Sequence, residues 1–557
     1  MVTGILQGKT VDLPGESYGA LLYRSLQNGG ENIAMINAET GVETTYQEIF
    51  ECTVSLAHHL QRLRLTKNDT ISICSPNSVY FTIPTIAALY LGITFAPVNH
   101  FYTSAELVHC FNLSKPTIVF CTVSSLENII TACKSIKTIK KIILLDKNTT
   151  VHRDIPSLEE LLHFNRHAKF EVTPVDDEHV AAILCSSGTT GLAKGVMLTH
   201  KNFQAAHIWT IDPDFAAFRA SKVGLALLPF YHAYGLLIHL VMLAMHMKMV
   251  VLARFEEQLF LSAIQQHRVT NACLVPPLIL FLGKSPIATK YDLSSVTEIV
   301  CAAAPLGREI QELTMKRLGS VNIRQGYGLT ESTLGVTLTP ANRHKHGSVG
   351  VVGPNMQLKV RDPESNRALG PNENGEICMR GAMIMQGYIG NPEATTSTLD
   401  SEGWLLTGDM GYYDTDGYVY IVDRYKELIK YKGLQVPPAE IEAILLKHPQ
   451  IKDCGVIGRP DSAAGEVPVA FVVKQPRATI TEADVINFAA AHLSHHKRLH
   501  GGVRFVQEIP KSATGKILRR VLREQLNVAR NGHKPLAVWN VDEVGGYPRQ
   551  MCGLYPS

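Results

Sequence analysis

The sequence lacks the features that mark several classes of protein. Charged residues make up 18% of its 557 positions, below the roughly 25% of average folded domains, and 53 Lys and Arg nearly balance 50 Asp and Glu. Because no long basic run interleaves with aromatic residues, the charge gives no support for a nucleic-acid partner. With 45% apolar residues the chain can bury a sizeable core, which excludes disorder along its whole length.

Cysteine pairs, a signal peptide and a long apolar run are also missing. The 11 cysteines are spread from Cys52 to Cys552 without a CxxC pair, a usage that favours reduced thiols over a secreted disulfide scaffold. No basic segment followed by an apolar one opens the chain, so no signal peptide is expected. The most apolar stretch, 235–252, is interrupted by His239, His246 and Lys248; it predicts a buried helix followed by a strand, not a membrane span.

Short apolar runs alternate with amphipathic stretches up to about residue 420. This alternation is typical of parallel α/β layers. The predicted strands are 70–74, 117–121, 142–145 and 180–185, and 79–91 is a predicted helix. From Gly353 onward the spacing changes, which indicates a smaller β-rich subdomain. Its predicted strands are 358–361, 375–380 and 418–422.

A compact α/β segment follows residues 423–424. Its predicted elements are helices at 439–447 and 482–493, strands at 453–457, 469–473 and 503–506, and a helix that begins near Lys516. From about residue 528 the chain has no clear period and several Gly and Pro breakers, which predicts an irregular tail over 528–557.

One glycine-rich segment, 185–195, directly follows a predicted buried strand. Its backbone N–H groups, the hydroxyls of its Ser and Thr residues and the cation of Lys194 are suited to holding a phosphate. The segment is not a Walker A loop, because the required Gly and Ser or Thr positions hold Ala193 and Gly195. Taken alone, it is also compatible with a Gly/Thr-rich connector.

Four further clusters carry polar groups suited to a nucleotide. In 324–332, Tyr327 could stack on a purine, Thr330 could bond a phosphate oxygen and Glu331 could hold Mg²⁺. In 407–409, the Asp409 carboxylate could accept both hydroxyls of a ribose. The lysine-rich segment 423–433 and the segment 512–516, Ser-Ala-Thr-Gly-Lys, complete the set. Each is a weak signal alone, since a lysine-rich run is usually a solvated face.

Together these five motifs, in this order, resemble the adenylate-forming superfamily over residues from about 20 to 527. The sequence is most similar to the 4-coumarate–CoA ligases and the firefly-luciferase-like acyl-CoA synthetases; 254–260, 290–299 and 499–516 look particularly luciferase-like. The resemblance implies an ATP-, Mg²⁺- and coenzyme A-dependent reaction that passes through an acyl-adenylate. It also implies an α/β fold: a large N-terminal domain, 1–423, of two α/β layered subdomains plus a β-rich subdomain, and a small mobile α+β C-terminal domain, 424–527.

The resemblance assigns roles to residues at matching positions. Lys516 would bridge the carboxylate and the α-phosphate, Thr330 would touch the α-phosphate, and Glu331 would bind Mg²⁺. The nucleotide would be bound by Ser186, Ser187, Gly188, Thr189, Thr190, Gly191, Lys194, Ala303, Ala304, Pro305, Gln325, Gly326, Tyr327, Gly328, Asp409, Ile421 and Arg424. Rotation of the C-terminal lobe about a hinge at Asp423 would then bring Lys430, Lys432 and Gly433 to the coenzyme A side.

Histidines divide between the acyl site and the surface. His232 matches the family's histidine at the acyl site, although a lone His beside aromatics is also compatible with a satisfied core residue. We interpret the histidines at 492, 495, 496 and 500 as a basic helix end, because Lys497 and Arg498 lie among them and no Cys or carboxylate is spaced for zinc.

The resemblance places Ala206, Tyr234, Ala302 and Leu334 at the acyl pocket. Beetle luciferases carry an arginine, a glycine and a small hydroxylic residue where this chain has Ala206, Ala302 and Leu334. An apolar pocket suits an alkyl chain, so a medium- to long-chain fatty acid is the expected substrate. A phenylpropanoid acid, and a low luciferase-type monooxygenase activity on a luciferin adenylate, are the alternatives.

Other functional classes have less support in the sequence. A carrier-protein-dependent adenylation domain would be followed by a GGxS phosphopantetheine site, and a non-catalytic binding protein would have lost Lys516, Glu331 or Asp409. We expect a monomer or weak dimer without a transmembrane segment. A cytoplasmic location is expected, with the peroxisome as the alternative, although the chain ends in Tyr-Pro-Ser and not in Ser-Lys-Leu.

Overall fold

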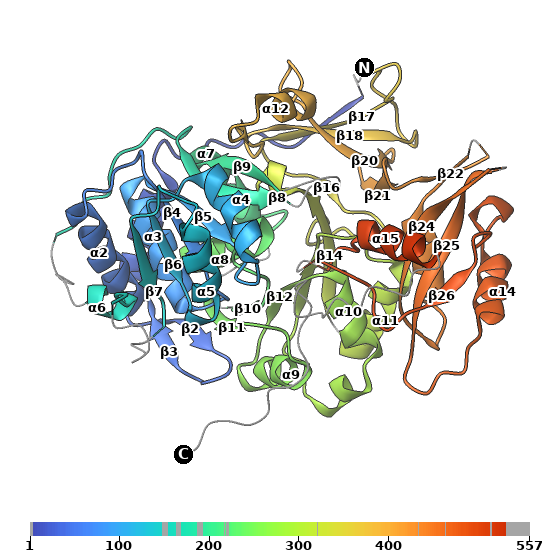
Figure 1. Ribbon diagram of the computed structural model, residues 1–557, viewed down its shortest axis with the longest axis horizontal. Coiled ribbons are helices and arrows are strands. Elements are labelled where there is room, and N and C mark those ends of the chain that lie inside the picture. Colours follow the sequence, from blue (N-terminus) through green and yellow to red (C-terminus); the bar gives the residue numbers. More distant parts are fainter. Residues whose placement is uncertain are drawn as a thin grey trace. The chain divides into compact units, whose positions relative to one another are not determined.

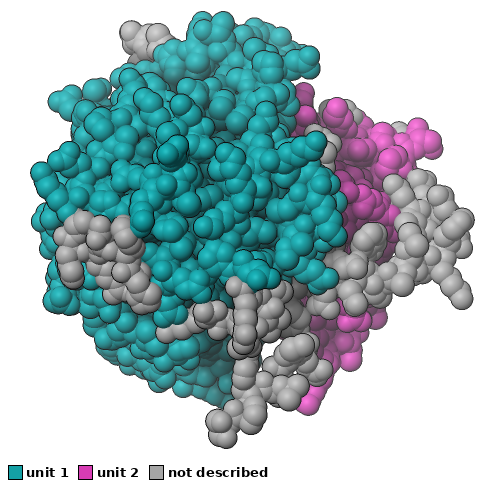
Figure 2. Space-filling view, turned by 60° about the vertical axis from the view of Figure 1, so that its left-hand side comes forward, with its two compact units in different colours: residues 1–421 teal, residues 422–557 magenta. Residues whose placement is uncertain are grey.

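A computed structural model describes most of the chain (Figure 1). The described residues are 4–146, 154–162, 169–186, 193–216, 218, 222–319, 321–432, 434–462, 464–512 and 515–530, with side chains up to 526. They divide into two compact units, residues 1–421 and 422–557 (Figure 2). The predicted boundary after residue 423 is close to this division.

The first sheet of unit 1 has seven strands and is parallel over five of them. In spatial order they are β19 (Gly387–Tyr388), β9 (Lys194–Thr199), β8 (Val180–Ser186), β5 (Thr94–Val98), β4 (Thr70–Cys74), β6 (Ile118–Cys121) and β7 (Lys141–Leu144). Helix α2 (Tyr46–Arg62) precedes β4, and the helices between β4 and β8 in sequence are α3 (Val79–Leu91), α4 (Ser104–Ser114), α5 (Val123–Cys133) and α6 (Leu158–Leu162). Helix α3 begins where the Ser78 side chain accepts the Phe81 N–H and ends at Gly92 with a φ of 66°.

The second sheet of unit 1 has nine strands, of which the six central ones are parallel. Their order is β16 (Val351–Val352), β15 (Gly335–Leu338), β14 (Asn322–Gly328), β13 (Glu298–Cys301), β12 (Asn271–Leu274), β10 (Val223–Ala226), β11 (Lys248–Val251), β2 (Ile33–Asn37) and β3 (Glu43–Thr45). Its helices are α1 (Tyr18–Gly29), α7 (His200–Ile211), α8 (Ala233–Ala244), α9 (Glu257–Gln266), α10 (Pro276–Lys284) and α11 (Arg308–Leu318), with the 3₁₀ helices η1 (Pro286–Lys290) and η2 (Thr330–Ser332).

One hydrophobic core joins both sheets. It contains residues of β4 and β5 from the first sheet, of β2 and β11 from the second, and of the almost entirely buried helices α3 and α8. The apolar stretch 235–252 is therefore the predicted buried helix followed by a strand, α8 and β11. Among the described residues no helix is both long enough and apolar enough to cross a membrane.

A third, antiparallel sheet forms the β-rich part that the turn-rich spacing predicts. Its order is β1 (Ile5–Gln7), β17 (Met356–Arg361), β18 (Gly375–Gly381), β20 (Leu405–Tyr413) and β21 (Val419–Arg424), and α12 (Pro392–Thr398) precedes β20.

Unit 2 is a small α+β body around a five-stranded sheet. The order is β23 (Leu434–Val436), β22 (Ile429–Tyr431), β25 (Gly465–Lys474) and β24 (Ile451–Asp461), and β26 (Val503–Phe505) also pairs with β25. Its helices are α13 (Pro438–Leu445), α14 (Glu482–His492), η3 (His495–Lys497) and α15 (Arg519–Arg530). Helix α15 begins three residues later than predicted and includes 528–530, which the sequence placed in an irregular tail; residues 531–557 lie outside the described residues.

Candidate active site

Three side chains that face one another connect the end of the glycine-rich segment to the Thr-Glu motif. Lys194, the first residue of β9, lies with Nζ 4.5 Å from the centre of the Tyr388 ring. The Tyr388 hydroxyl donates a hydrogen bond to Glu331 Oε1 over 2.9 Å. Burial and the Glu331 charge raise the pKa of Tyr388, so the phenol keeps its proton and remains a donor. A cation and a carboxylate, the groups required around a Mg²⁺-bound polyphosphate, therefore share one region of unit 1.

A tight turn after β14 sets the position of Glu331. Ser332 Oγ accepts the Leu329 N–H over 2.9 Å and closes the 3₁₀ helix η2. Thr333 then adopts a left-handed φ of 65°, and its hydroxyl donates to the Met383 carbonyl over 2.6 Å. Met383 precedes β19, which carries Tyr388, so the same turn orders both partners of the hydrogen bond.

Tyr327 and Asp409, predicted to meet a purine and a ribose, meet each other. The Tyr327 hydroxyl donates to Asp409 Oδ2 over 2.6 Å, and both residues are buried. Asp409 follows Gly408, whose left-handed φ of 69° favours glycine, and the Gly408 N–H donates to the Glu376 carboxylate over 3.0 Å. The two predicted nucleotide contacts are thus adjacent, although they lie 82 residues apart in sequence.

The predicted adenine slot has exposed and buried parts. Ala303 and Pro305 are exposed on the turn after β13, and Ala303 has a strained φ of 76° for a residue other than glycine. The Gln325 side chain is buried and donates to Gln311 over 3.0 Å, so its amide serves the packing of β14 on α11.

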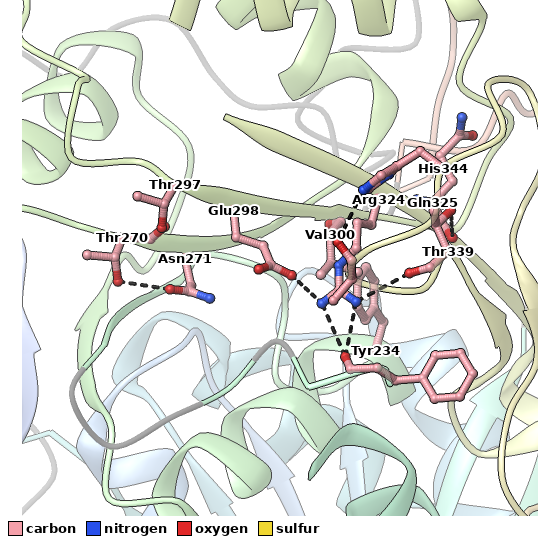
Figure 3. A network of polar contacts seen from close by, with 12 residues as sticks. Tyr234, Thr270, Asn271, Thr297, Glu298, Val300, Arg324, Gln325, Thr339 and His344 are labelled. Carbon is pink, nitrogen blue, oxygen red and sulfur yellow. Dashed lines mark hydrogen bonds and ion pairs between the residues drawn. The ribbon is translucent and has the colours of Figure 1, made fainter. Parts of the chain in front are cut away.

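Arg324 directly precedes the slot residue Gln325, and no role for it was predicted. It is fully buried; it forms an ion pair with Glu298 and donates to the Phe215 and Thr339 carbonyls. Figure 3 shows Glu298 on one side of the guanidinium and Thr339 on the other. This network fixes β13, which precedes the slot residues 303–305, and β14, which contains the slot residues 325–328.

His232 lies at the start of α8, where it is half-buried beside the Tyr231 ring. Burial lowers the pKa of His232 to about 4, so the imidazole is neutral near pH 7. The loop before it is held by Asn77, which sequence reasoning missed. Asn77 Nδ2 donates to the Leu227 and Leu228 carbonyls at 3.2 and 2.9 Å, and Oδ1 accepts the Phe230 N–H at 2.8 Å.

The predicted acyl-pocket residues occupy three environments. The Tyr234 hydroxyl donates to the Val300 carbonyl over 2.9 Å (Figure 3) and so ties α8 to β13. Half-buried Ala302 directly follows this strand. Leu334 is 6% exposed, and Ala206 is fully buried in α7. A small cavity at α8 has a different lining: Leu225, Ala226, Leu228, Phe230, Gly235, Ile238, His239, Met242 and Cys273. His239 is the most polar of these lining residues, and its Nε2 lies 2.9 Å from the Thr82 hydroxyl.

In unit 2, the main chain of Lys516 is hydrogen-bonded to Ser512. The Lys516 N–H donates to Ser512 Oγ over 3.1 Å, and the Ser512 N–H donates to the Lys516 carbonyl over 2.8 Å. Neighbouring Lys511 is 2.6 Å from the Asp453 carboxylate. Backbone contacts thus fix the main chain of the predicted catalytic lysine.

The predicted hinge residue is held by backbone donors. Asp423 is buried; its carboxylate accepts the Arg424 and Ala439 N–H groups at 2.7 and 2.9 Å. Close to it, Arg519 Nη2 donates to both carboxylate oxygens of Glu442, at 2.7 and 2.9 Å. Burial raises the pKa of Asp423, and the positive charge of Arg519 opposes this shift.

The predicted coenzyme A-side lysines lie on β22 and just after it. Lys430 is exposed, and Lys432 has a left-handed φ of 48° with its N–H on the Ala464 carbonyl at 2.7 Å. Between them, Tyr431 stacks on His500 with ring centres 4.9 Å apart. The histidines at 492, 495, 496 and 500 do not form the one basic helix end that the sequence predicts. Helix α14 ends at His492, the 3₁₀ helix η3 follows, and His500 packs on Tyr431.

Several predicted residues lie outside the described part of the chain: Ser187, Gly188, Thr189, Thr190, Gly191 and Gly433. Of the remaining predicted nucleotide contacts, Ser186 pairs with Lys194 in the β8–β9 ladder, and Ile421 and Arg424 belong to β21. The described residues include no group of three or more His, Cys, Asp or Glu placed to hold a metal ion. Glu331, one carboxylate beside the phosphate segment, nevertheless fits Mg²⁺, which binds through one or two carboxylates plus substrate phosphates.

Comparison with known proteins identifies the family. A family model described as AMP-binding enzyme matches residues 22–389, and one described as AMP-binding enzyme C-terminal domain matches 440–516. The chain is 44% identical over 501 residues to a luciferin 4-monooxygenase of Nipponoluciola cruciata, covering 89% of this chain and 91% of that protein.

Two plant ligases are also similar. The chain is 37% identical over 515 residues to a peroxisomal OPC-8:0-CoA ligase 1 of Arabidopsis thaliana, covering 91% of this chain and 93% of that protein. It is 38% identical over 517 residues to a 4-coumarate–CoA ligase 2 of Petroselinum crispum, covering 90% of this chain and 93% of that protein.

Among solved structures, the fold is similar to ATP-bound MatB from Rhodopseudomonas palustris, with a TM-score of 0.82 and 29% identity over 91% of this chain and 98% of that chain. These findings confirm the superfamily that the motifs predict, and the α/β fold with a large N-terminal and a smaller C-terminal domain. The chain therefore belongs to the AMP-binding enzyme family, the adenylate-forming superfamily that also contains coenzyme A ligases.

Proposed function

We propose that the protein is an AMP-forming acid–thiol ligase, which activates a carboxylic acid with ATP and transfers the acyl group to coenzyme A. The observation that carries this proposal is the contact of Lys194, Tyr388 and Glu331, a cation and a carboxylate joined through one phenol. The similarity to coenzyme A ligases and to an ATP-bound structure supports it.

In the first step, a carboxylate oxygen attacks the α-phosphorus of ATP, and pyrophosphate leaves. Ser186 and Lys194 are proposed to bind the β- and γ-phosphates, and Thr330 the α-phosphate. Glu331 would hold Mg²⁺, which neutralises phosphate charge when bound. We assign Lys516 to the charge that develops between the carboxylate and the α-phosphate. Asp409 and Arg424 are proposed to bind the ribose.

In the second step, the thiol of coenzyme A attacks the acyl carbon, and AMP leaves. His232 is neutral at pH 7, so its ring offers a hydrogen-bond acceptor at the acyl site. We propose that residues 424–527 rotate about Asp423 between the steps, and that Lys430, Lys432 and Gly433 then serve the thiol. The hydrogen bonds between Lys516 and Ser512 support this proposal, because they tie the main chain of Lys516 to the unit that would carry it.

For the acid, we propose a medium- to long-chain fatty acid. Of the residues predicted to line the acyl pocket, Ala206 and Leu334 are buried and apolar, which suits an alkyl chain.

A phenylpropanoid acid is the second candidate, favoured by the similarity to a 4-coumarate–CoA ligase. A luciferase-type monooxygenase reaction is the third, favoured by the 44% identity to a luciferin 4-monooxygenase. We place it below the others because Leu334 offers no hydroxyl to a heteroaromatic adenylate.

A panel of acids separates these candidates. Full-length protein is incubated with ATP, Mg²⁺, coenzyme A and C8 to C18 fatty acids, coumarate, caffeate or luciferin, and AMP and thioesters are identified by mass. Fatty acyl-CoA is the expected product, and coumaroyl-CoA or light emission would replace our choice of acid. Lys516→Ala should lose the activity, and Lys452→Ala, an exposed lysine of the same unit, should retain it.

We further propose that the enzyme acts in the cytoplasm as a monomer or weak dimer. The similarity to a peroxisomal ligase keeps the peroxisome as the alternative. Imaging of the tagged protein with a peroxisomal marker distinguishes the compartments, and sedimentation of the purified protein gives its oligomeric state.

A further inference from the structure

Two cysteine sulfurs lie almost in contact beside the glycine-rich segment. Cys185, next to last in β8, and Cys110, in α4, have Sγ atoms 3.4 Å apart. Both are free thiols; Cys110 is 2% exposed and Cys185 is half-buried. A disulfide needs sulfurs about 2.0 Å apart, so bond formation requires an approach of roughly 1.4 Å from the observed 3.4 Å.

Helix α4 contacts both strands that flank the glycine-rich segment. Cys110 meets Cys185 on β8, and His109 Nε2 lies 2.6 Å from the carbonyl of Ala193, the residue before β9. In the β8–β9 ladder Cys185 pairs with Gly195, and Ser186 pairs with Lys194. A covalent change at Cys185 therefore occurs beside two proposed phosphate ligands. Ser186 is the next residue in β8, and Lys194 adjoins Gly195, the partner of Cys185 in β9.

We propose that Cys110 and Cys185 form a reversible disulfide, a redox modification site that controls nucleotide binding at the adjacent segment. The reagent is a small hydroperoxide, and the reductant that reverses the bond is a dithiol. The existence of the disulfide is independent of the function proposed above, whereas its effect on nucleotide binding rests on that function.

The two thiols differ in pKa and in exposure, as a thiol that reacts with peroxide and a thiol that resolves the product should. Hydrogen bonding from Cys110 lowers the pKa of Cys185, and the same contact together with burial raises the pKa of Cys110. Cys185 is thus the more readily ionised sulfur, and it is also the more exposed one. It meets the oxidant first, and buried Cys110 acts as the resolving thiol.

The steps balance with one peroxide. The Cys185 thiolate attacks a peroxide oxygen; an S–O bond forms, the O–O bond breaks, and hydroxide leaves and takes a proton as water. The Cys110 sulfur then attacks the sulfenic sulfur; an S–S bond forms, the S–O bond breaks, and hydroxide leaves with the Cys110 proton as a second water. Two thiols and hydrogen peroxide give one disulfide and two waters.

Closing the bond draws the end of β8 towards α4. Because Ser186 and Lys194 share a rung of the ladder, this movement shifts Lys194 relative to the Tyr388 ring, 4.5 Å away. We expect the affinity for ATP to fall by roughly 5-fold or more, at the lower end of typical coupling between two sites.

The test treats full-length protein with hydrogen peroxide and maps cross-linked peptides by mass without reduction. A Cys110–Cys185 peptide that dithiothreitol removes is the expected result. Absence of this peptide, a sulfinic acid at Cys185, or a cross-link to another cysteine would overturn the proposal. ATP affinity is measured by calorimetry before oxidation, after oxidation and after reduction.

Matched variants separate the disulfide from general oxidation. Cys110→Ser should neither cross-link nor lose ATP affinity on treatment, whereas Cys133→Ser, at a half-buried cysteine of α5, should behave like the parent. Equal loss in the Cys110→Ser variant would contradict control by this pair. Should the reduced protein bind no ATP, the proposed function fails, while the peptide map still decides the disulfide.

Discussion

Asn77 is expected to position His232 without touching the substrate. Its amide makes three hydrogen bonds, of 3.2, 2.9 and 2.8 Å, to the backbone of residues 227–230, and the residue is 5% exposed. Asn77→Ala leaves three buried backbone groups without partners. Each costs about 1–3 kcal/mol, and costs within one network do not add fully, so we expect a loss of about 3 kcal/mol in the free energy of unfolding.

The same change should reduce activity through the position of the imidazole. A shift of the loop before α8 moves His232, and a misplacement of about 1 Å at a reacting group can cost roughly 100-fold in rate. We expect kcat/KM to fall by about 10- to 100-fold. Urea unfolding and initial rates of AMP formation, measured on the same preparation, give both quantities.

Asn355→Ala is the matched control. Asn355 makes two hydrogen bonds to the Val11 backbone, at 2.9 and 2.8 Å, and ties down the N-terminal segment. It should lose stability but keep kcat/KM. If both variants lose stability and keep kcat/KM, the positioning role of Asn77 is refuted.

Three further changes test the site and its scaffold. Tyr388→Phe keeps the ring under Lys194 but removes the hydrogen bond to Glu331, worth about 1.5 kcal/mol, so the KM for ATP should rise about 10-fold in initial-rate assays; an unchanged KM would contradict the role of this contact. His207 is 6% exposed and its pKa is lowered by burial to about 4; the unfolded state therefore binds more protons between pH 6.5 and 4, and stability falls as the pH drops. His207→Phe should remove about 2 kcal/mol of the stability lost between pH 7 and 5 in urea titrations, and an identical pH dependence in both proteins would count against it. Arg519→Met leaves buried Glu442 unpaired and should cost about 3–5 kcal/mol in unfolding free energy, whereas Arg520→Met, which removes an exposed pair with Glu524, should cost under about 0.5 kcal/mol; equal costs would show that burial is not the cause.

Local elements could be predicted from the sequence because their signals are local. Strand β4 and helix α3 have the predicted bounds, since the apolar run of each ends at turn residues and the helix lies between Ser78 and Gly92. The predicted start of α15 is three residues too early because Ile517 instead pairs with Lys511 in an antiparallel β-bridge. The histidines of 492–500 suggested one helix, but α14 stops at His492, and the backbone turns before His495.

Contacts between distant segments could not be predicted in the same way. The motifs placed Tyr327 and Asp409 near a nucleotide, but no periodicity shows that their side chains hydrogen-bond to each other. Tyr388 and Asn77 carry no motif, and they gain their roles only when β19 meets η2 and when the loop before α3 meets residues 227–230. Their signal is a polar side chain that becomes buried with its hydrogen bonds satisfied, which is a property of the fold.

Product stoichiometry tests the central claim most directly. The protein is incubated with ATP, Mg²⁺, coenzyme A and a C8 to C18 fatty acid, and the nucleotide and thioester products are quantified by mass spectrometry. An AMP-forming acid–thiol ligase should yield AMP, pyrophosphate and fatty acyl-CoA in equal amounts, and Lys516→Ala should yield none of them. ADP as the nucleotide product, or AMP without a thioester from any acid of the panel, would contradict the account.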